Sequence, residues 1–158
     1  MDERSAHRLL WLIRHAQARD AHPGEPDQAR ELTRQGRRQA EALARWLAPR
    51  IAAHDPLILV SPAIRTRVTA EIALRPVDQP RIRIEDALWA ADLHRLTGLI
   101  HTVGQPLVLI GHNPGLEQLQ HWLTGTLLPL PTGGAFEIAM SRDAARLTAR
   151  YVPDSDST

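Results

Sequence analysis

Hydrophobic residues fall into short apolar runs that alternate with longer amphipathic stretches. The apolar runs lie at residues 9–13, 56–60 and 107–110, and each is closed by a polar residue or a glycine. Runs of this length are typical of buried strands. Between them, apolar residues recur at helical spacing, and they are Ala40, Leu43, Leu47, Ile51, Val68, Ile72, Leu93, Leu96, Ile100, Val103, Leu116, Leu119 and Leu123. Strands that alternate with helices predict a layered α/β domain.

Capping residues and prolines indicate where the helices begin and end. Thr33 is the expected N-cap of the first helix, and Pro49 is expected to kink or end that helix. Ser61 and Asn113 each precede a proline, which is an N-cap and first-turn signature. The sequence therefore predicts one helix over residues 63–74 and another after Asn113.

The remaining segments complete a sheet. Residues 81–84 alternate Arg and Ile, which predicts a half-exposed edge strand. Residues 136–140 and 147–152 are expected to be antiparallel strands joined by a turn at residues 141–143. We therefore predict an α/β domain with one sheet, which is parallel where helices connect its strands. The polar loop at residues 17–31 is long enough to have a function of its own.

Composition limits the class of protein. A chain of 158 residues is expected to form a single domain over residues 1–158, with its core at about residues 8–152 and loose ends. The absence of cysteine excludes a thiol nucleophile and a cysteine zinc site, and no histidine has ligand spacing, so we expect no metal and no cofactor. A net charge of +1 gives no general attraction to nucleic acid. The polar start is neither a signal peptide nor a membrane span, which predicts a cytoplasmic protein that does not bind membranes.

Charged residues follow the predicted strands. Arg14 and His15 end the first strand, Arg65 lies just after the second, and Gly111 and His112 end the third. The carboxyl ends of parallel strands share one edge of a sheet, so we expect these side chains to converge. This set suits phosphoryl transfer, in which a neutral His15 attacks phosphorus and the two arginines neutralise the non-bridging oxygens. His112 would donate a hydrogen bond to the transferred group.

These residues resemble a known family. The Leu-Ile-Arg-His-Ala stretch at residues 12–16 is similar to the Arg-His-Gly signature of the histidine phosphatase (phosphoglycerate mutase-like) superfamily, with Ala16 in the glycine position. Residues 32–36, 61–69 and 110–114 resemble further motifs of that family in the same order. The short chain and the Arg-His-Ala variant are most similar to the SixA-like branch, the phosphohistidine phosphatases. The resemblance implies that His15 is the phosphorylated nucleophile and that Arg14, Arg65 and His112 form the phosphate pocket. It also implies a three-layer α/β/α sandwich around a mostly parallel central sheet.

One departure from the family bears on the substrate. Larger members carry an acidic proton donor near the position of Ala87, where this chain has only the neighbouring Glu85 and Asp86 as candidate donors, followed by Trp89. An alkoxide leaving group needs such a proton, whereas the imidazole of a phosphohistidine is a better leaving group. This favours a phosphorylated protein as the partner. A small phosphate ester, with Glu85 or Asp86 as the acid, and a non-catalytic module that binds phosphorylated ligands remain as alternatives.

Overall fold

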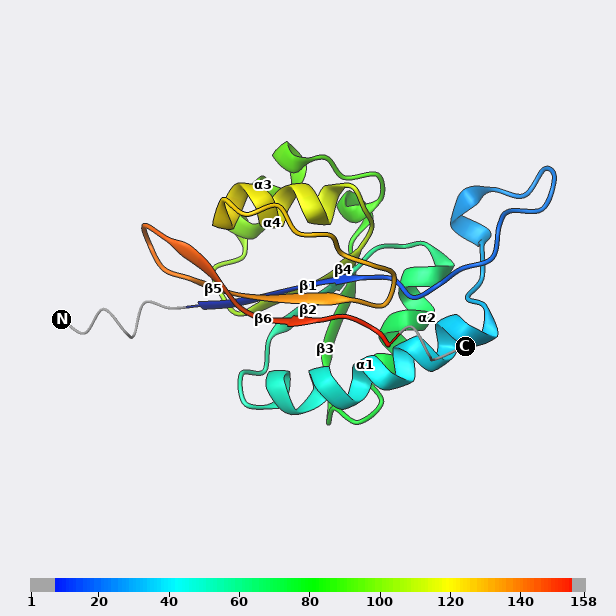
Figure 1. Ribbon diagram of the computed structural model, residues 1–158, viewed down its shortest axis with the longest axis horizontal. Coiled ribbons are helices and arrows are strands. Elements are labelled where there is room, and N and C mark those ends of the chain that lie inside the picture. Colours follow the sequence, from blue (N-terminus) through cyan, green and yellow to red (C-terminus); the bar gives the residue numbers. More distant parts are fainter. Residues whose placement is uncertain (1–7, 155–158) are drawn as a thin grey trace.

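Six strands form one mixed sheet in the computed structural model, which describes residues 8–154 (Figure 1). The strands are β1 (Arg8–Arg14), β2 (Leu57–Val60), β3 (Arg81–Ile84), β4 (Leu107–Gly111), β5 (Ala135–Met140) and β6 (Ala145–Tyr151), in the order β3-β2-β4-β1-β5-β6. The first four in that order are parallel, and β5 and β6 are antiparallel. The mostly parallel sheet and the terminal hairpin are therefore confirmed.

Four α-helices cover the two faces of the sheet. They are α1 (Arg34–Ala52), α2 (Ile64–Ala73), α3 (Leu93–Thr102) and α4 (Gly115–Thr124), and two short 3-10 helices, η2 (Asp27–Ala29) and η3 (Asp86–Leu88), lie in the connections. Figure 1 shows α1 and α2 on one face and α3 and α4 on the other. The three-layer α/β/α architecture is thus confirmed.

Successive side chains of each strand point to opposite faces of the sheet, and this alternation divides the apolar strand residues between two core clusters. In β1, Leu10 and Leu12 belong to the apolar cluster that includes α3 and α4, whereas Trp11 and Ile13 belong to the cluster with α1 and α2. All four side chains are fully buried. Because successive strand side chains point to opposite faces, a central strand covered by helices on both sides must be apolar throughout. The continuous apolar runs in the sequence have this cause.

The boundaries of α1 agree with the sequence at one end and differ at the other. The Thr33 hydroxyl accepts a hydrogen bond from the Gly36 N–H, so Thr33 is the N-cap, as predicted. Gly36 packs so closely on the start of the loop after β1 that a Cβ there would lie 2.0 Å from the Gln17 carbonyl oxygen. The helix does not end at Pro49 but continues to Ala52. A proline in the last turn removes one hydrogen bond, and the buried Ile51 holds the turn in place.

The prediction that Ser61 caps α2 is wrong. The N-cap is Ala63, which makes no side-chain capping bond, and the Ser61 hydroxyl bonds elsewhere. Ile72 is buried as expected, but Val68 is only partly buried. At α4 the N-cap residue is Pro114. The Asn113 side chain still accepts a hydrogen bond from the N–H of Glu117, which lies in the first turn of the helix.

Strand β3 lies at the edge of the sheet, as predicted, and pairs only with β2 among the described strands. All four of its side chains are exposed, so the prediction of a half-exposed strand is wrong. Within residues 8–154, no helix combines the length and the apolar character needed to cross a membrane. The expected loose ends, at residues 1–7 and 155–158, lie outside the described residues.

Candidate active site

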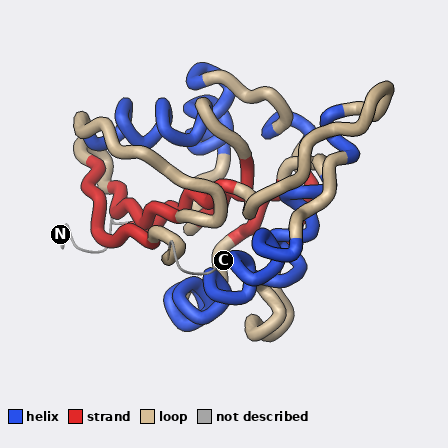
Figure 2. The backbone as a smooth tube through the Cα atoms, turned by 45° about the vertical axis from the view of Figure 1, so that its right-hand side comes forward, coloured by secondary structure: helices blue, strands red, loops and turns tan. Residues whose placement is uncertain are grey.

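The carboxyl ends of β1, β2 and β4 bring the predicted site residues to one edge of the sheet. Arg14 of β1 pairs with Gly111 of β4, and the next N–H, of His15, donates to the Gly111 carbonyl at 3.1 Å. The Ser61 N–H, just after β2, donates to the Ile110 carbonyl at 3.1 Å. The loop that follows β1 projects beyond this edge, as Figures 1 and 2 show. Parallel pairing in register therefore places three strand ends next to one another.

His15 is held as a neutral imidazole in one tautomer. Its side chain is only 7% exposed, and its Nδ1 lies 2.7 Å from the Ala16 carbonyl oxygen. A carbonyl can only accept, so Nδ1 carries the proton and Nε2 keeps its lone pair. Burial lowers the pKa of His15 from 6.5 to about 4, helped by the positive charges of Arg65, Arg14 and Arg30. His15 is thus uncharged and nucleophilic at neutral pH.

His112 lies beside His15 with 5.4 Å between the two ring centroids. Its Nε2 lies 2.7 Å from the Ser61 hydroxyl oxygen, and its buried Nδ1 has no partner in the described part of the chain. Burial, followed by the charge of Arg65, lowers the pKa of His112 to about 3. If the Ser61 hydroxyl donates to Nε2, the proton of the neutral ring is on Nδ1. In that tautomer, the imidazole N–H at Nδ1 is free to donate.

The two predicted arginines each keep an unpartnered nitrogen. Arg14 donates from Nη1 to the Leu130 carbonyl at 3.1 Å, and Arg65 donates to Asp27 through both Nη atoms. In each guanidinium the Nε is buried and has no partner within residues 8–154. Arg30 Nε also has no hydrogen-bond partner there, although it lies 2.9 Å from the Asp27 carboxylate. With Nδ1 of His112, the site therefore has three buried nitrogens that have neither a hydrogen bond nor an ion pair among the described residues. Buried polar groups are rarely left unpaired, which indicates a binding site for an acceptor-rich group.

Thr69 ties this arrangement together from α2. Its buried hydroxyl accepts the Ala16 N–H at 2.9 Å and donates to the Arg65 carbonyl at 2.7 Å. One side chain thus links the end of β1 to the first turn of α2. The relative placement of His15 and Arg65 depends on this contact.

Asp27 and Arg30, from the loop after β1, are site residues that the sequence analysis missed. The Asp27 carboxylate lies 2.9 Å from Arg65 Nη2 through one oxygen and 2.9 Å from Arg30 Nε through the other. Burial raises the pKa of Asp27, but the hydrogen bond and charge of Arg65, together with Arg30, lower it overall. Asp27 is therefore ionised at neutral pH. The only signal in the sequence was the unusual length of the loop.

Trp89 forms a wall of the site. Its ring is perpendicular to that of His112 at a centroid distance of 5.2 Å, and the Arg65 guanidinium carbon lies 5.4 Å from its centroid. A cavity of about 520 Å³ is lined by Trp89, Arg65, His112, Asp27 and Asp92, among others. A second cavity of about 520 Å³, lined mainly by apolar residues, shares Trp89 and Asp27 with the first.

The candidate proton donors Glu85 and Asp86 line neither of these two cavities. The Glu85 N–H continues the sheet by donating to the Val60 carbonyl at 2.8 Å. Of the acidic residues that do line the first cavity, Asp92 accepts the Arg95 N–H at the start of α3. No group of three or more His, Asp or Glu residues that could hold a metal ion occurs in the part of the chain that the structure describes.

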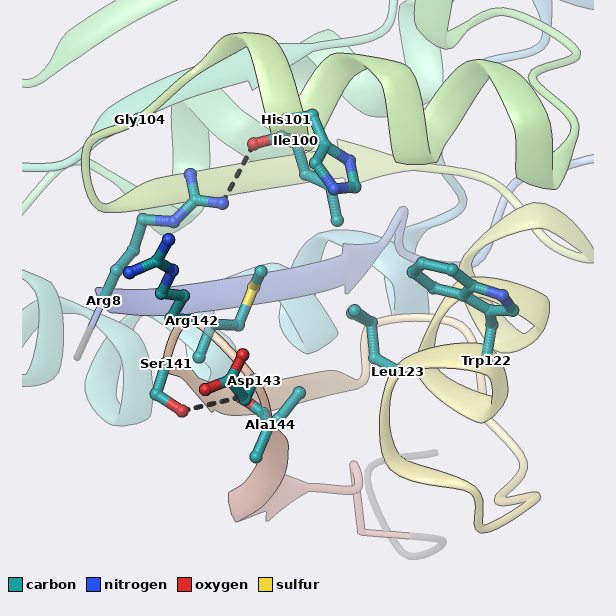
Figure 3. Close-up of a pocket in the computed structure, with 12 residues that line it drawn as sticks. Arg8, Ile100, His101, Gly104, Trp122, Leu123, Ser141, Arg142, Asp143 and Ala144 are labelled. Carbon is teal, nitrogen blue, oxygen red and sulfur yellow. Dashed lines mark hydrogen bonds between the residues drawn. The ribbon is translucent and has the colours of Figure 1, made fainter. Parts of the chain in front are cut away.

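Another cavity, of about 470 Å³, lies at the opposite end of β1 (Figure 3). Its wall includes Arg8, His101, Trp122 and Arg142. The Arg8 guanidinium donates to the backbone carbonyls of Ile100, Gln105 and Val103, so it is committed to the α3–β4 connection. None of the unpartnered buried nitrogens found among residues 8–154 lies in this cavity. The unsatisfied donors gather at the His15 end of the sheet.

Comparisons with known proteins find a matching family model and similar solved structures. Residues 10–106 match the family model of the histidine phosphatase superfamily (branch 1). The structure is similar to that of a presumed phosphohistidine phosphatase SixA from Agrobacterium tumefaciens, with 32% sequence identity, 92% of this chain and 98% of that chain covered, and a TM-score of 0.79. A comparison with curated proteins finds no match.

Two further solved structures share the fold. The protein histidine phosphatase SixA complexed with tungstate is 21% identical, with 90% of this chain and 95% of that chain covered and a TM-score of 0.74. A presumed α-ribazole-5'-P phosphatase from Escherichia coli K-12 is 20% identical, with coverage of 89% and 94% and a TM-score of 0.68.

Proposed function

The chain belongs to the histidine phosphatase superfamily and is a phosphatase, and we propose that it removes phosphate from a phosphohistidine of a partner protein through a covalent phospho-His15 intermediate. Membership of the family sets aside the alternative of a non-catalytic binding module.

The observation that carries the proposal is the set of unpartnered buried nitrogens around a neutral His15. Nε of Arg14, Nε of Arg65 and Nδ1 of His112 are donors without acceptors. A phosphoryl group presents three non-bridging oxygens, each able to accept hydrogen bonds, and guanidinium donors suit it well. In a site of this kind, donors fixed before the reaction stabilise the charge of the transition state without reorganisation.

The tautomer of His15 defines the first chemical step. Nε2 of His15 attacks phosphorus, the bond from phosphorus to the leaving group breaks, and Arg14 and Arg65 neutralise the equatorial oxygens. The Nδ1 proton stays on the ring and is held by the Ala16 carbonyl. The phosphorylated ring is therefore positively charged, which makes it a good leaving group in the second step.

Water completes the cycle. Its oxygen attacks the phosphorus of phospho-His15, the Nε2–P bond breaks, and the bonding electrons return to Nε2. His15 leaves as the neutral imidazole, still protonated at Nδ1, and both water protons remain on the phosphate. No external acid is needed for this step, because the ring already has its second proton.

The absence of a poised carboxylic acid favours a phosphohistidine over an ester. Asp27 is held ionised by two arginines, and one oxygen of Asp92 caps α3, so neither is suited to donate a proton to an alkoxide. General acid catalysis of that kind typically contributes two to four orders of magnitude in rate. A small phosphate ester is the second candidate, because a cavity of about 520 Å³ next to His112 is within the size range of small-molecule sites.

The test compares three substrates without added metal. We expect kcat/KM for a phosphohistidine peptide to exceed that for a sugar phosphate by at least about 100-fold, with an aryl phosphate between them, since the missing acid is worth about that factor. His15→Ala should abolish turnover of all three, while His121→Ala, an exposed histidine on α4, should not. Quenching at alkaline pH, where phosphohistidine survives, followed by peptide mapping should locate phosphate on His15. Faster turnover of the sugar phosphate would refute the phosphohistidine assignment, and full activity of His15→Ala would refute the nucleophile.

A further inference from the structure

A basic leaving group must obtain a proton, and none of the described side chains that line the site is suited to give one. Of the titratable side chains that line the cavity beside His15, Asp27 is ionised and His112 is neutral with a pKa of about 3. Asp92 is engaged at the start of α3. Among substrates with a basic leaving group, the site therefore favours one that brings its own proton.

A phosphohistidine ring can do so when its distal nitrogen is protonated. That ring is a flat cation, and breaking its P–N bond returns the electron pair to the ring, which departs as a neutral imidazole. A site that depends on this form needs a surface that stabilises a flat cation next to the phosphoryl group. Aromatic faces, tryptophan best among them, and carboxylates provide such surfaces.

Trp89 and Asp27 together have these properties. Both line the cavity that contains Arg65 and His112, and both also line the neighbouring apolar cavity, so open space borders them on more than one side. The Trp89 ring already accepts a flat cation, since the Arg65 guanidinium lies 5.4 Å from its centroid. No hydrogen bond from its indole N–H occurs within residues 8–154, and the ring is partly exposed. Asp27 adds a negative charge at the same boundary.

We propose that Trp89 and Asp27 form a subsite for the cationic imidazole ring of the substrate, so that the site selects the protonated form of a phosphohistidine. The proposal rests on the proposed function and adds to it the group that recognises the leaving ring. In the step itself, the His15 Nε2–P bond forms, the P–N bond of the substrate breaks, and the ring leaves neutral with the proton it brought. The positive charge passes from the substrate ring to phospho-His15, and no further reactant is required.

Two measurements test the subsite in the full chain. The first is the ratio of kcat/KM for a phosphohistidine peptide to that for p-nitrophenyl phosphate, whose leaving group needs no proton. We expect Trp89→Leu to lower this ratio about 3- to 30-fold, the range typical of a cation–π contact, and Trp89→Phe to restore most of it. Trp122→Leu, at an exposed tryptophan near the opposite end of the sheet, is the control and should leave the ratio unchanged.

The second measurement does not depend on the substrate assignment. We expect 1,3-dimethylimidazolium, a permanent flat cation, to inhibit hydrolysis of p-nitrophenyl phosphate more strongly than the uncharged 1-methylpyrazole. Trp89→Leu and Asp27→Asn should each reduce that difference, and Asp27→Asn provides the test if the leucine variant does not fold.

The outcomes separate the two proposals. An unchanged ratio in Trp89→Leu, or equal inhibition by the two ring compounds in the wild-type protein, overturns the subsite. If the wild-type protein hydrolyses the aryl ester but not the phosphohistidine peptide, the proposed function fails, and the inhibitor comparison alone then supports or overturns the cation subsite.

Discussion

Mild acid should destabilise this protein through the same burial that keeps His15 nucleophilic. The pKa of His15 is about 4 in the folded chain, mainly because of burial, and returns to about 6.5 on unfolding. Between these values the unfolded state binds a proton that the folded state does not. The contribution of the neutral His15 to the free energy of unfolding is therefore fully present above pH 6.5 and is lost as the pH falls towards 4. His112, whose pKa is lowered in the same direction, adds to the effect.

The two pKa values set the size of the effect. With 6.5 for the unfolded chain and about 4 for the folded one, lowering the pH from 7.5 to 5 costs about 2 kcal/mol of unfolding free energy for His15 alone. That is a large share of the roughly 5–15 kcal/mol by which a domain is usually stable. Glu25 and Asp27 add little between pH 7.5 and 5, because the pKa of Glu25 is about 2 and that of Asp27 is lowered from its ordinary value.

Urea unfolding at pH 7.5 and 5.0 measures the effect, in buffers free of phosphate and sulfate, since a bound anion would change the titration. The wild-type protein should lose at least about 2 kcal/mol between the two pH values, and His15→Asn should lose about 2 kcal/mol less than the wild type. His121→Asn, at an exposed position, should match the wild type. If His15→Asn and the wild type lose the same stability, His15 is not held neutral by the fold, and the argument for its nucleophilicity fails.

Three further substitutions test the packing and the hydrogen bonds described above. Gly36→Ala should destabilise the fold by more than about 2 kcal/mol in urea unfolding, because a Cβ there would lie 2.0 Å from the Gln17 carbonyl oxygen; a loss under 1 kcal/mol would contradict the close contact. Ser61→Ala should lower kcat for p-nitrophenyl phosphate by about 10-fold, with a smaller change in the free energy of unfolding, because His112 loses the partner that fixes its tautomer. An unchanged kcat would argue against that role of Ser61. Glu137→Ala should cost about 2–4 kcal/mol of unfolding free energy, as this buried carboxylate accepts hydrogen bonds from three side chains, and its kcat should change little in protein that remains folded.

The sequence was sufficient to predict the sheet and to place four candidate site residues near one another. Buried parallel strands must be apolar on both faces, so they are visible as short apolar runs, and the first polar residues after them lie at one edge of the sheet. Arg14, His15, Arg65 and His112 could therefore be placed together from their positions alone. Thr33 was identified as a cap for a similar reason, because N-capping depends on residues within one turn.

Only the tertiary structure decided which partners the polar side chains take. Ser61 has the local signature of a cap but bonds to His112, a residue 51 positions away that its own sequence neighbourhood cannot reveal. Asp27 reaches Arg65 through an irregular loop, which has no periodicity to predict its path. Trp89 likewise meets His112 and Arg65 only because three strand ends lie side by side. The spacing of apolar residues and the capping of helices are local properties, which the sequence determines by itself. Contacts between loops depend on where the whole chain brings those loops. The proposed subsite of Trp89 and Asp27 for the leaving group is built from such contacts.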